Sequence, residues 1–151
     1  MTPPNDEYYM RLALAEAQKA YDEGEVPVGC VITLGGEVVA SAYNLREKSQ
    51  NALYHAETLA IGAACAKIKY WRLCGCEMFV TLEPCAMCYG AAVNARIKRI
   101  IYGADDKKAG VLGSVLDLSV YKFNHGIEIT RNILQKECGE LLSSFFKKLR
   151  Q

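Results

Sequence analysis

The amino-acid sequence predicts one α/β domain, residues 1–151, in which helices pack over a mixed β-sheet. Short apolar segments rich in β-branched residues alternate with longer segments of helical character, and the first two apolar segments are joined by a tight turn. Strands that alternate with helices after an opening hairpin are typical of α/β domains. A chain of 151 residues can also bury a sizeable core within one domain.

The first predicted element is an amphipathic helix. Asn5 and Asp6 offer N-caps, apolar residues then follow helical spacing as far as Tyr21, and Gly24 is a suitable end. The helix therefore precedes the first apolar, β-branched segment.

A β-hairpin follows this helix. Residues 28–34 are apolar and β-branched, Gly35-Gly36 is a typical hairpin turn, and residues 37–42 return as a second strand. The polar residues 45–51 are expected to form a loop that leads to the next helix.

The rest of the chain predicts three helices and three strands. Residues 56–69 and 85–94 are rich in alanine, and Pro84 lies near the start of the second segment, where proline suits a helix. The other predicted elements are strands at residues 77–82, 99–102 and 128–130, a loop at 105–113, and a final helix at 132–150.

Composition excludes several classes of protein. Hydrophobic residues make up 51% and charged residues 23%, as in ordinary globular proteins. No apolar run approaches the roughly 18 residues of a membrane span, so no membrane partner is expected. Residues 1–7 contain neither the basic nor the apolar region of a secretory signal, so the expected location is cytoplasmic. The seven cysteines are then expected as thiols or metal ligands.

Cys85 and Cys88, in the segment Leu82-Glu83-Pro84-Cys85-Ala86-Met87-Cys88, form half of a candidate metal site. At i and i+3 on one helical turn, the two thiols can face the same ion. His55, one of only two histidines, supplies a third ligand of a type that binds zinc well. Three protein ligands leave a fourth position for water, which is typical of a catalytic zinc.

Glu57 supplies the proton carrier that such a site needs. Hydrolysis of an amidine-like ring carbon requires one proton to be taken from water and others to be given to a ring nitrogen and to ammonia. His55 and Glu57 would lie about 200° apart on a regular helix. They can share a pocket only at a helix start, so the helix is expected to begin close to His55.

Other interpretations of the cysteines remain open at this point. A lone C-x-x-C can be a structural zinc site, a redox pair or chance, and Cys74 and Cys76 could complete a four-thiolate site. Their spacing is unusual for such ligands, so both are interpreted as small buried hydrophobic residues. The same interpretation applies to the remaining three thiols, Cys30, Cys65 and Cys138.

The joint pattern H-x-E followed by P-C-x-x-C is the signature of zinc deaminases. In this sequence it is His55-Ala56-Glu57 followed by Pro84-Cys85-Ala86-Met87-Cys88. With its flanking segments, the chain resembles the bacterial tRNA-specific adenosine deaminases nearly from end to end. Those segments are Glu25-Val26-Pro27-Val28-Gly29, Asn44, Trp71-Arg72-Leu73, residues 80–84, 102–106, Gly113-Ser114, Asn124-His125 and 141–150.

The resemblance implies a three-layer α/β/α cytidine deaminase-like fold, with a central mixed sheet of about five strands and helices on both faces. It implies hydrolytic conversion of adenosine to inosine at the wobble position of a tRNA anticodon, by a homodimer that binds the anticodon stem-loop. It makes His55, Cys85 and Cys88 the ligands of one Zn²⁺ per chain, and Glu57 the proton shuttle. The implied substrate contacts are Val28, Asn44, the backbone of Ala56, Asp106, Lys108 and Phe146.

Alternatives accompany these substrate contacts. Asn44 could be a turn residue, Phe146 a core residue, and Asp106 with Lys108 a solvated pair. The chain also departs from the family, since many members carry Asp-Pro-Thr-Ala where this sequence has Asn51-Ala52-Leu53-Tyr54. That change leaves every zinc ligand in place and falls beside the substrate entrance.

Two other functions remain possible on the sequence alone. One is a zinc deaminase of a free nucleobase or nucleoside, such as guanine, cytosine or cytidine, and the other is a non-catalytic zinc-stabilised binding domain. The net charge of +1 gives little general attraction to RNA, so an RNA enzyme needs a local basic patch. The expected patch, beside aromatic residues suited to base stacking, is Lys147, Lys148, Arg150, Lys107, Lys108 and Arg46.

Overall fold

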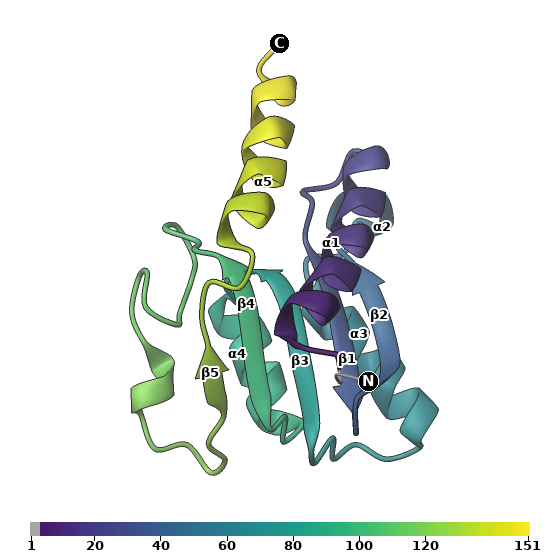
Figure 1. Cartoon of the computed structure of the whole chain (residues 1–151), viewed down its shortest axis with the longest axis vertical. Helices are drawn as coiled ribbons and strands as arrows, with labels where there is room; N and C mark the ends of the chain where they lie inside the picture. The colour runs from purple at the N-terminus through teal and green to yellow at the C-terminus, as the bar shows by residue number, and fades with distance from the viewer. Residues whose placement is uncertain (1–3) are drawn as a thin grey trace.

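The computed structural model describes residues 4–151 (Figure 1). The first three residues of the predicted domain lie outside the described residues. The elements, in chain order, are α1 (Asp6–Asp22), β1 (Gly29–Leu34), β2 (Glu37–Tyr43), α2 (Arg46–Ser49), α3 (Ala56–Ile68), β3 (Cys76–Leu82), α4 (Ala86–Asn94), β4 (Arg99–Ala104), a 3₁₀ turn (Leu118–Val120), β5 (Glu128–Thr130) and α5 (Gln135–Leu149).

The five strands form one mixed sheet in the order β2-β1-β3-β4-β5. β1 pairs antiparallel with both β2 and β3, whereas β3 and β4, and then β4 and β5, run parallel. The parallel pairs place the carboxyl ends of β3 and β4 at the same edge of the sheet. The segments that leave these two ends carry Cys85 and Asp106, so this edge is where a site can form.

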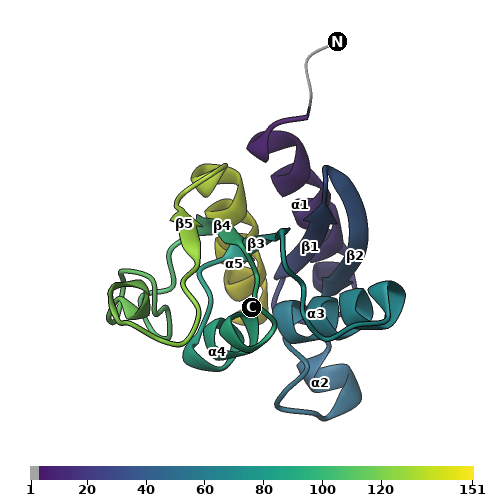
Figure 2. The same ribbon diagram turned by 90° about the horizontal axis from the view of Figure 1, so that it is seen from below.

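Helices cover both faces of the sheet. α1 and α5 lie on one face, and α3 and α4 lie on the other (Figures 1 and 2). The central strands show why, because neighbouring residues such as Val31 and Ile32 are both fully buried and belong to different hydrophobic clusters. Strands buried on both faces need a helical layer on each side. The predicted three-layer α/β/α fold is therefore confirmed.

Helix α1 packs unusually closely against the sheet at Gly29. A Cβ atom at Gly29, the first residue of β1, would overlap the backbone of Ala13 and Ala17 in α1. Glycine here allows the backbone of α1 to lie directly against the start of β1. Within residues 4–151, no helix has the length and apolar character needed to cross a membrane.

The structure corrects two local predictions. Residues 45–51 were expected to be a loop, but they contain the short helix α2, whose N-cap residue Leu45 makes no capping bond through its side chain. The final helix begins at Gln135 rather than at residue 132, because Asn132 and Leu134 have φ angles of 62° and 54°. A left-handed backbone cannot belong to a right-handed helix.

Candidate active site

Two helix N-termini meet at the site. His55 is the N-cap residue of α3 and Cys85 is the N-cap residue of α4, and both have extended backbone conformations. The His55 carbonyl accepts the first helical hydrogen bond from Leu59, and the Cys85 carbonyl accepts one from Tyr89. Each helix thus fixes the backbone of its cap residue, and the side chain of that residue extends away from the helix.

The three predicted metal ligands come together. His55 Nδ1 lies 3.7 Å from Cys85 Sγ and 3.5 Å from Cys88 Sγ. The ligand atoms of all three residues lie within 4.8 Å of one another. One imidazole nitrogen and two sulfurs at this spacing fit a tetrahedral zinc ion, with Cys88 buried and the other two partly open.

The two thiols, Cys85 and Cys88, have pKa values shifted in opposite directions. The pKa of Cys85 is lowered to about 4, chiefly by the hydrogen bond from Cys88 and also by His55. That same hydrogen bond, together with burial, raises the pKa of Cys88. The hydrogen bond with Cys85 also raises the pKa of His55. The site therefore favours a thiolate at Cys85, which is the form that binds metal.

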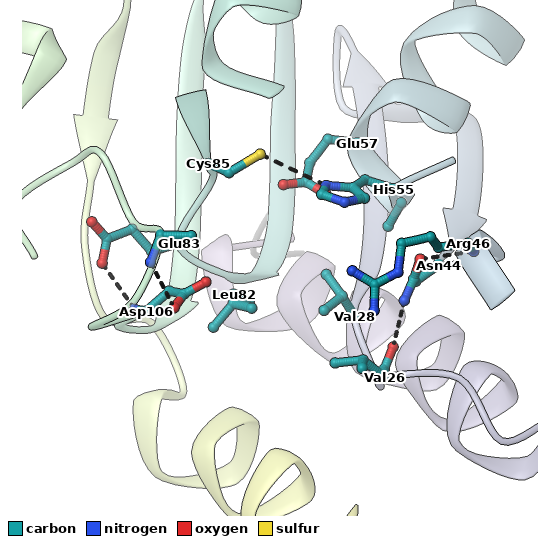
Figure 3. A pocket seen from close by; sticks show the side chains of 12 residues that line it. Val26, Val28, Asn44, Arg46, His55, Glu57, Leu82, Glu83, Cys85 and Asp106 are labelled. Carbon is teal, nitrogen blue, oxygen red and sulfur yellow. Dashed lines mark hydrogen bonds between the residues drawn. The ribbon is translucent and has the colours of Figure 1, made fainter. Parts of the chain in front are cut away.

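Glu57 faces this cluster from the first turn of α3. The predicted geometric difficulty is resolved because His55 lies outside the helix, in extended backbone, so that its side chain and that of Glu57 converge (Figure 3). Glu57 is only 4% exposed, and burial raises the pKa of its carboxyl group to about 7. A carboxyl group with such a pKa can exchange protons near neutral pH.

A cavity of about 200 Å³ opens beside these residues. Figure 3 shows Glu57, His55 and Cys85 on one side of it, Val26, Val28, Asn44 and Arg46 on a second, and Leu82, Glu83 and Asp106 on a third. The remaining lining residues are Ala56 and Ala109. A candidate metal site, a buried carboxyl group and apolar walls therefore share one concave pocket.

Comparisons with known proteins place the chain in a family. Residues 4–150 match the family model described as MafB19-like deaminase. The chain is 46% identical to a tRNA-specific adenosine deaminase of Bacillus subtilis over 147 residues, which covers 97% of this chain and 91% of that protein. It is also 46% identical to the protein of the same name from Aquifex aeolicus, over 95% of both chains. The chain belongs to the family of tRNA-specific adenosine deaminases.

Solved structures support the family at the level of fold. A structure from a study of A-to-I editing by tRNA:A34 deaminases at the wobble position has a TM-score of 0.82 and 36% identity, and the match covers 89% of this chain and 98% of that one. A guanine deaminase from Nitrosomonas europaea has a TM-score of 0.78 at 20% identity, covering 96% and 87% of the two chains. The second likeness shows the shared fold alone.

Of the substrate contacts that the family resemblance implies, some line the pocket and others do not. Val28, Asn44, Ala56 and Asp106 line the pocket. Lys108 does not, although its backbone N–H donates to the Asp106 carboxylate at 3.1 Å. Phe146 also lies outside the pocket, on α5, and it is 41% exposed rather than a core residue. The segment 51–54, where the sequence departs from the family, is likewise absent from the lining residues.

The cysteines outside the site are only partly as expected. Cys30, Cys76 and Cys138 are buried and Cys65 is half-buried, in line with small hydrophobic residues. Cys74 is exposed, so its interpretation as a buried residue is wrong. It follows Leu73, which is buried, and precedes Gly75, whose φ of 81° turns the chain at the surface.

Sequence reasoning missed two buried carboxylates, one that lines the pocket and one beside it. Glu25 is 1% exposed and Glu83 is 2% exposed, although both belong to segments that carry the family resemblance. A signal was present, since each directly precedes a proline-containing, largely apolar stretch. Acidic residues are almost never fully buried without specific partners.

Proposed function

We propose that this protein hydrolyses adenosine to inosine at the wobble position of a tRNA anticodon. The observation that carries the proposal is the convergence of His55, Cys85, Cys88 and buried Glu57 on one open pocket. The chain around this pocket is 46% identical, over 97% of its length, to a protein named tRNA-specific adenosine deaminase.

The donor set fits one zinc ion per chain, held by His55, Cys85 and Cys88. The three ligand atoms are mutually close, of types that zinc prefers, and polarised toward thiolate at Cys85. Zinc bound by three protein ligands, with its fourth position open, activates water for nucleophilic attack near neutral pH.

Glu57 is proposed to move the protons. Its carboxylate would take one proton from the attacking water and pass it to the ring nitrogen next to the reacting carbon. It would then take the second proton from the oxygen newly bonded to that carbon and give it to the leaving amine, so that the C–N bond breaks as the carbonyl forms. One water molecule is consumed and one ammonia is released, with Glu57 returned to its starting state. Burial, which raises the pKa of Glu57 to about 7, suits both the acceptance and the donation of protons.

The pocket walls are proposed to hold one nucleotide that has left its base stack. Val28 offers an apolar surface to the base, while Asn44, the Ala56 backbone and Asp106 offer polar groups. Lys108 and Phe146 lie outside the pocket, where they would contact the RNA on either side of the target. A target in an unpaired anticodon loop costs only a few kcal/mol to extrude.

The protein is proposed to act as a homodimer in the cytoplasm, where tRNA is modified. The segment 115–123 supports an association between subunits, because large apolar side chains gather on its surface. The exposed members are Val115, Leu116, Val120, Tyr121 and Phe123. Sedimentation at micromolar concentration should show a dimer, and a monomer would contradict this part of the proposal.

Ammonia release from four substrates in parallel tests the function. Zinc-loaded protein should deaminate an anticodon stem-loop with adenosine at the wobble position far faster than free adenosine, cytidine or guanine. The same stem-loop with guanosine at that position is the matched control and should release no ammonia. Processing of a free base or nucleoside as fast as the stem-loop would replace this function with a small-molecule deaminase.

A further inference from the structure

Glu25 performs a capping role for a helix that is distant in the sequence. Its carboxylate accepts hydrogen bonds from the backbone N–H of Glu47 at 3.0 Å and of Lys48 at 2.6 Å. Both N–H groups belong to the first turn of α2, where helical amides have no partner within the helix. Because Leu45, the N-cap residue, makes no capping bond through its side chain, Glu25 supplies what the local sequence lacks.

The segment that Glu25 holds forms one wall of the pocket. Asn44 and Arg46, which precede or begin α2, both line the cavity. Asn44 is tied in turn to Val26, since its Nδ2 group donates to the Val26 carbonyl at 3.3 Å and its Oδ1 atom accepts from the Arg46 N–H. This wall therefore joins residues 25–28 to the start of α2 through side chains that are nearly buried.

Glu83 likewise accepts backbone hydrogen bonds from the segment that forms a second wall of the pocket. Its carboxylate accepts from the backbone N–H of Asp106 at 3.0 Å, of Leu112 at 2.8 Å and of Ser114 at 3.2 Å. The Ser114 hydroxyl donates a further hydrogen bond to it. Since Asp106 and Ala109 line the cavity, the loop of residues 105–114 is folded around one buried carboxylate.

The hydrogen-bond donors around Glu25 and Glu83 require a side chain that only accepts hydrogen bonds. Each partner of Glu25 and Glu83 described above is an N–H or O–H donor, and charge-assisted bonds of this kind offset the cost of burying the charge. A Cβ atom at Gly110 would overlap the Glu83 carboxyl group, so the loop also leaves room for it. An amide side chain of the same shape would turn its NH₂ group toward an N–H.

We propose that Glu25 and Glu83 are positioning residues that hold two separate walls of the pocket at the spacing that the target nucleotide requires. The two walls meet the cavity from different sides (Figure 3). Neither carboxylate is assigned to the reacting atoms. This inference rests on the proposed function, because it concerns the nucleotide that the pocket accepts.

The isosteric variants Glu25→Gln and Glu83→Gln test the proposal. Each should keep one zinc per chain and lower kcat/KM for the wobble-adenosine stem-loop by roughly tenfold to hundredfold, which is the scale expected when a binding group is misplaced by about 1 Å. Most of the loss should be in KM, since the walls contact the nucleotide but do not transfer protons. Ser114→Ala, which keeps the carboxylate and removes one donor, should show a smaller change in the same direction.

Amide hydrogen exchange reports on each wall separately. Glu25→Gln should accelerate exchange in residues 44–49 and leave residues 105–114 as in the wild type, and Glu83→Gln should do the reverse. Glu77→Gln is the matched control, since Glu77 lies at the other end of β3 and pairs with Arg99 at 2.6 Å. It should leave both kinetic constants and both segments unchanged.

The outcomes separate this inference from the proposed function. If the wild type does not deaminate the stem-loop, the function is wrong. If the wild type is active and both Gln variants match it in KM and in exchange, the positioning role is wrong. Loss of zinc from Glu83→Gln without faster exchange in residues 105–114 would also overturn it, because Glu83 would then act through the metal ligands.

Discussion

The pocket around His55 and the C-terminal helix α5 are held by the fold in very different ways. In the pocket, Cys88 and Glu57 are buried, and the predicted metal ligands and Glu57 lie at the N-cap or in the first turn of a helix. On α5, Phe146, Lys147 and Lys148 project from the last turns of a helix that extends beyond the sheet (Figure 1). The chemistry is thus assigned to the most constrained residues, and the proposed RNA contacts to exposed ones.

This difference has a physical reason. A proton shuttle and metal ligands must keep sub-ångström geometry, which converging helix N-termini provide. Contacts with phosphates rely on charge at a distance and tolerate movement. Changes to the metal ligands or to Glu57 should therefore reduce turnover, whereas changes on α5 should weaken RNA binding.

Removal of a metal ligand should produce the largest effect. Cys85→Ser should lose zinc and reduce deamination to background, because the remaining two ligands cannot hold the ion in the same geometry. Metal content by atomic emission, together with ammonia release, measures both. Cys74→Ser and Cys76→Ser are the controls and should retain one zinc per chain; two ions per chain, or zinc loss at Cys74, would revive a structural four-thiolate site.

Glu57→Ala should be nearly as severe but should separate metal binding from chemistry. The variant should keep its zinc and its fold, and kcat should fall by about 10²–10⁴-fold or more, the range for loss of a general acid–base group. Single-turnover kinetics on the stem-loop measures the loss. Near wild-type turnover by the zinc-loaded variant would remove Glu57 from the mechanism.

Neutralising Lys147 and Lys148 together should act on binding. KM for the stem-loop should rise by roughly tenfold, with a smaller change in kcat, and the salt dependence of binding should flatten by roughly one counterion for each lysine–phosphate pair removed. Binding measured across a salt series tests this. Lys67 and Lys69, near the end of α3, form the matched control pair; an equal effect there would mean that net charge, not the α5 patch, attracts RNA.

The neighbouring residues Phe145 and Phe146 should sharpen the comparison, because one is buried and the other is exposed. Phe145 is 5% exposed and packs edge-on against Tyr21, so Phe145→Ala should cost about 3–5 kcal/mol of stability. Phe146 is 41% exposed, and Phe146→Ala should spare stability but weaken stem-loop binding by about 1–2 kcal/mol if a base stacks there. Thermal unfolding and RNA titration measure the pair, and unchanged RNA affinity in Phe146→Ala would remove the stacking contact.

Much of this fold could be predicted because its signals are local. Caps, glycine turns and apolar periodicity located the long helices and all five strands, usually within two residues of their ends. The short helix α2 could not be predicted in this way, since its amides are satisfied by Glu25, more than twenty positions earlier in the chain. The interpretation of Cys74 failed for a different, local reason, because the turn at Gly75 leaves it exposed.

By itself, the sequence determined the residue types of the site, since H-x-E and P-C-x-x-C carry their chemistry in their spacing. It also placed His55 close to the start of a helix, from the angular separation of residues i and i+2 alone. Only the tertiary structure decided which residues surround them. Parallel pairing of β3 and β4 brings Cys85 and the Asp106 loop to one edge, and Glu25 and Glu83 act on segments far away in the chain. A buried carboxylate is stable only where folding supplies its donors, and those donors cannot be identified from its sequence neighbours.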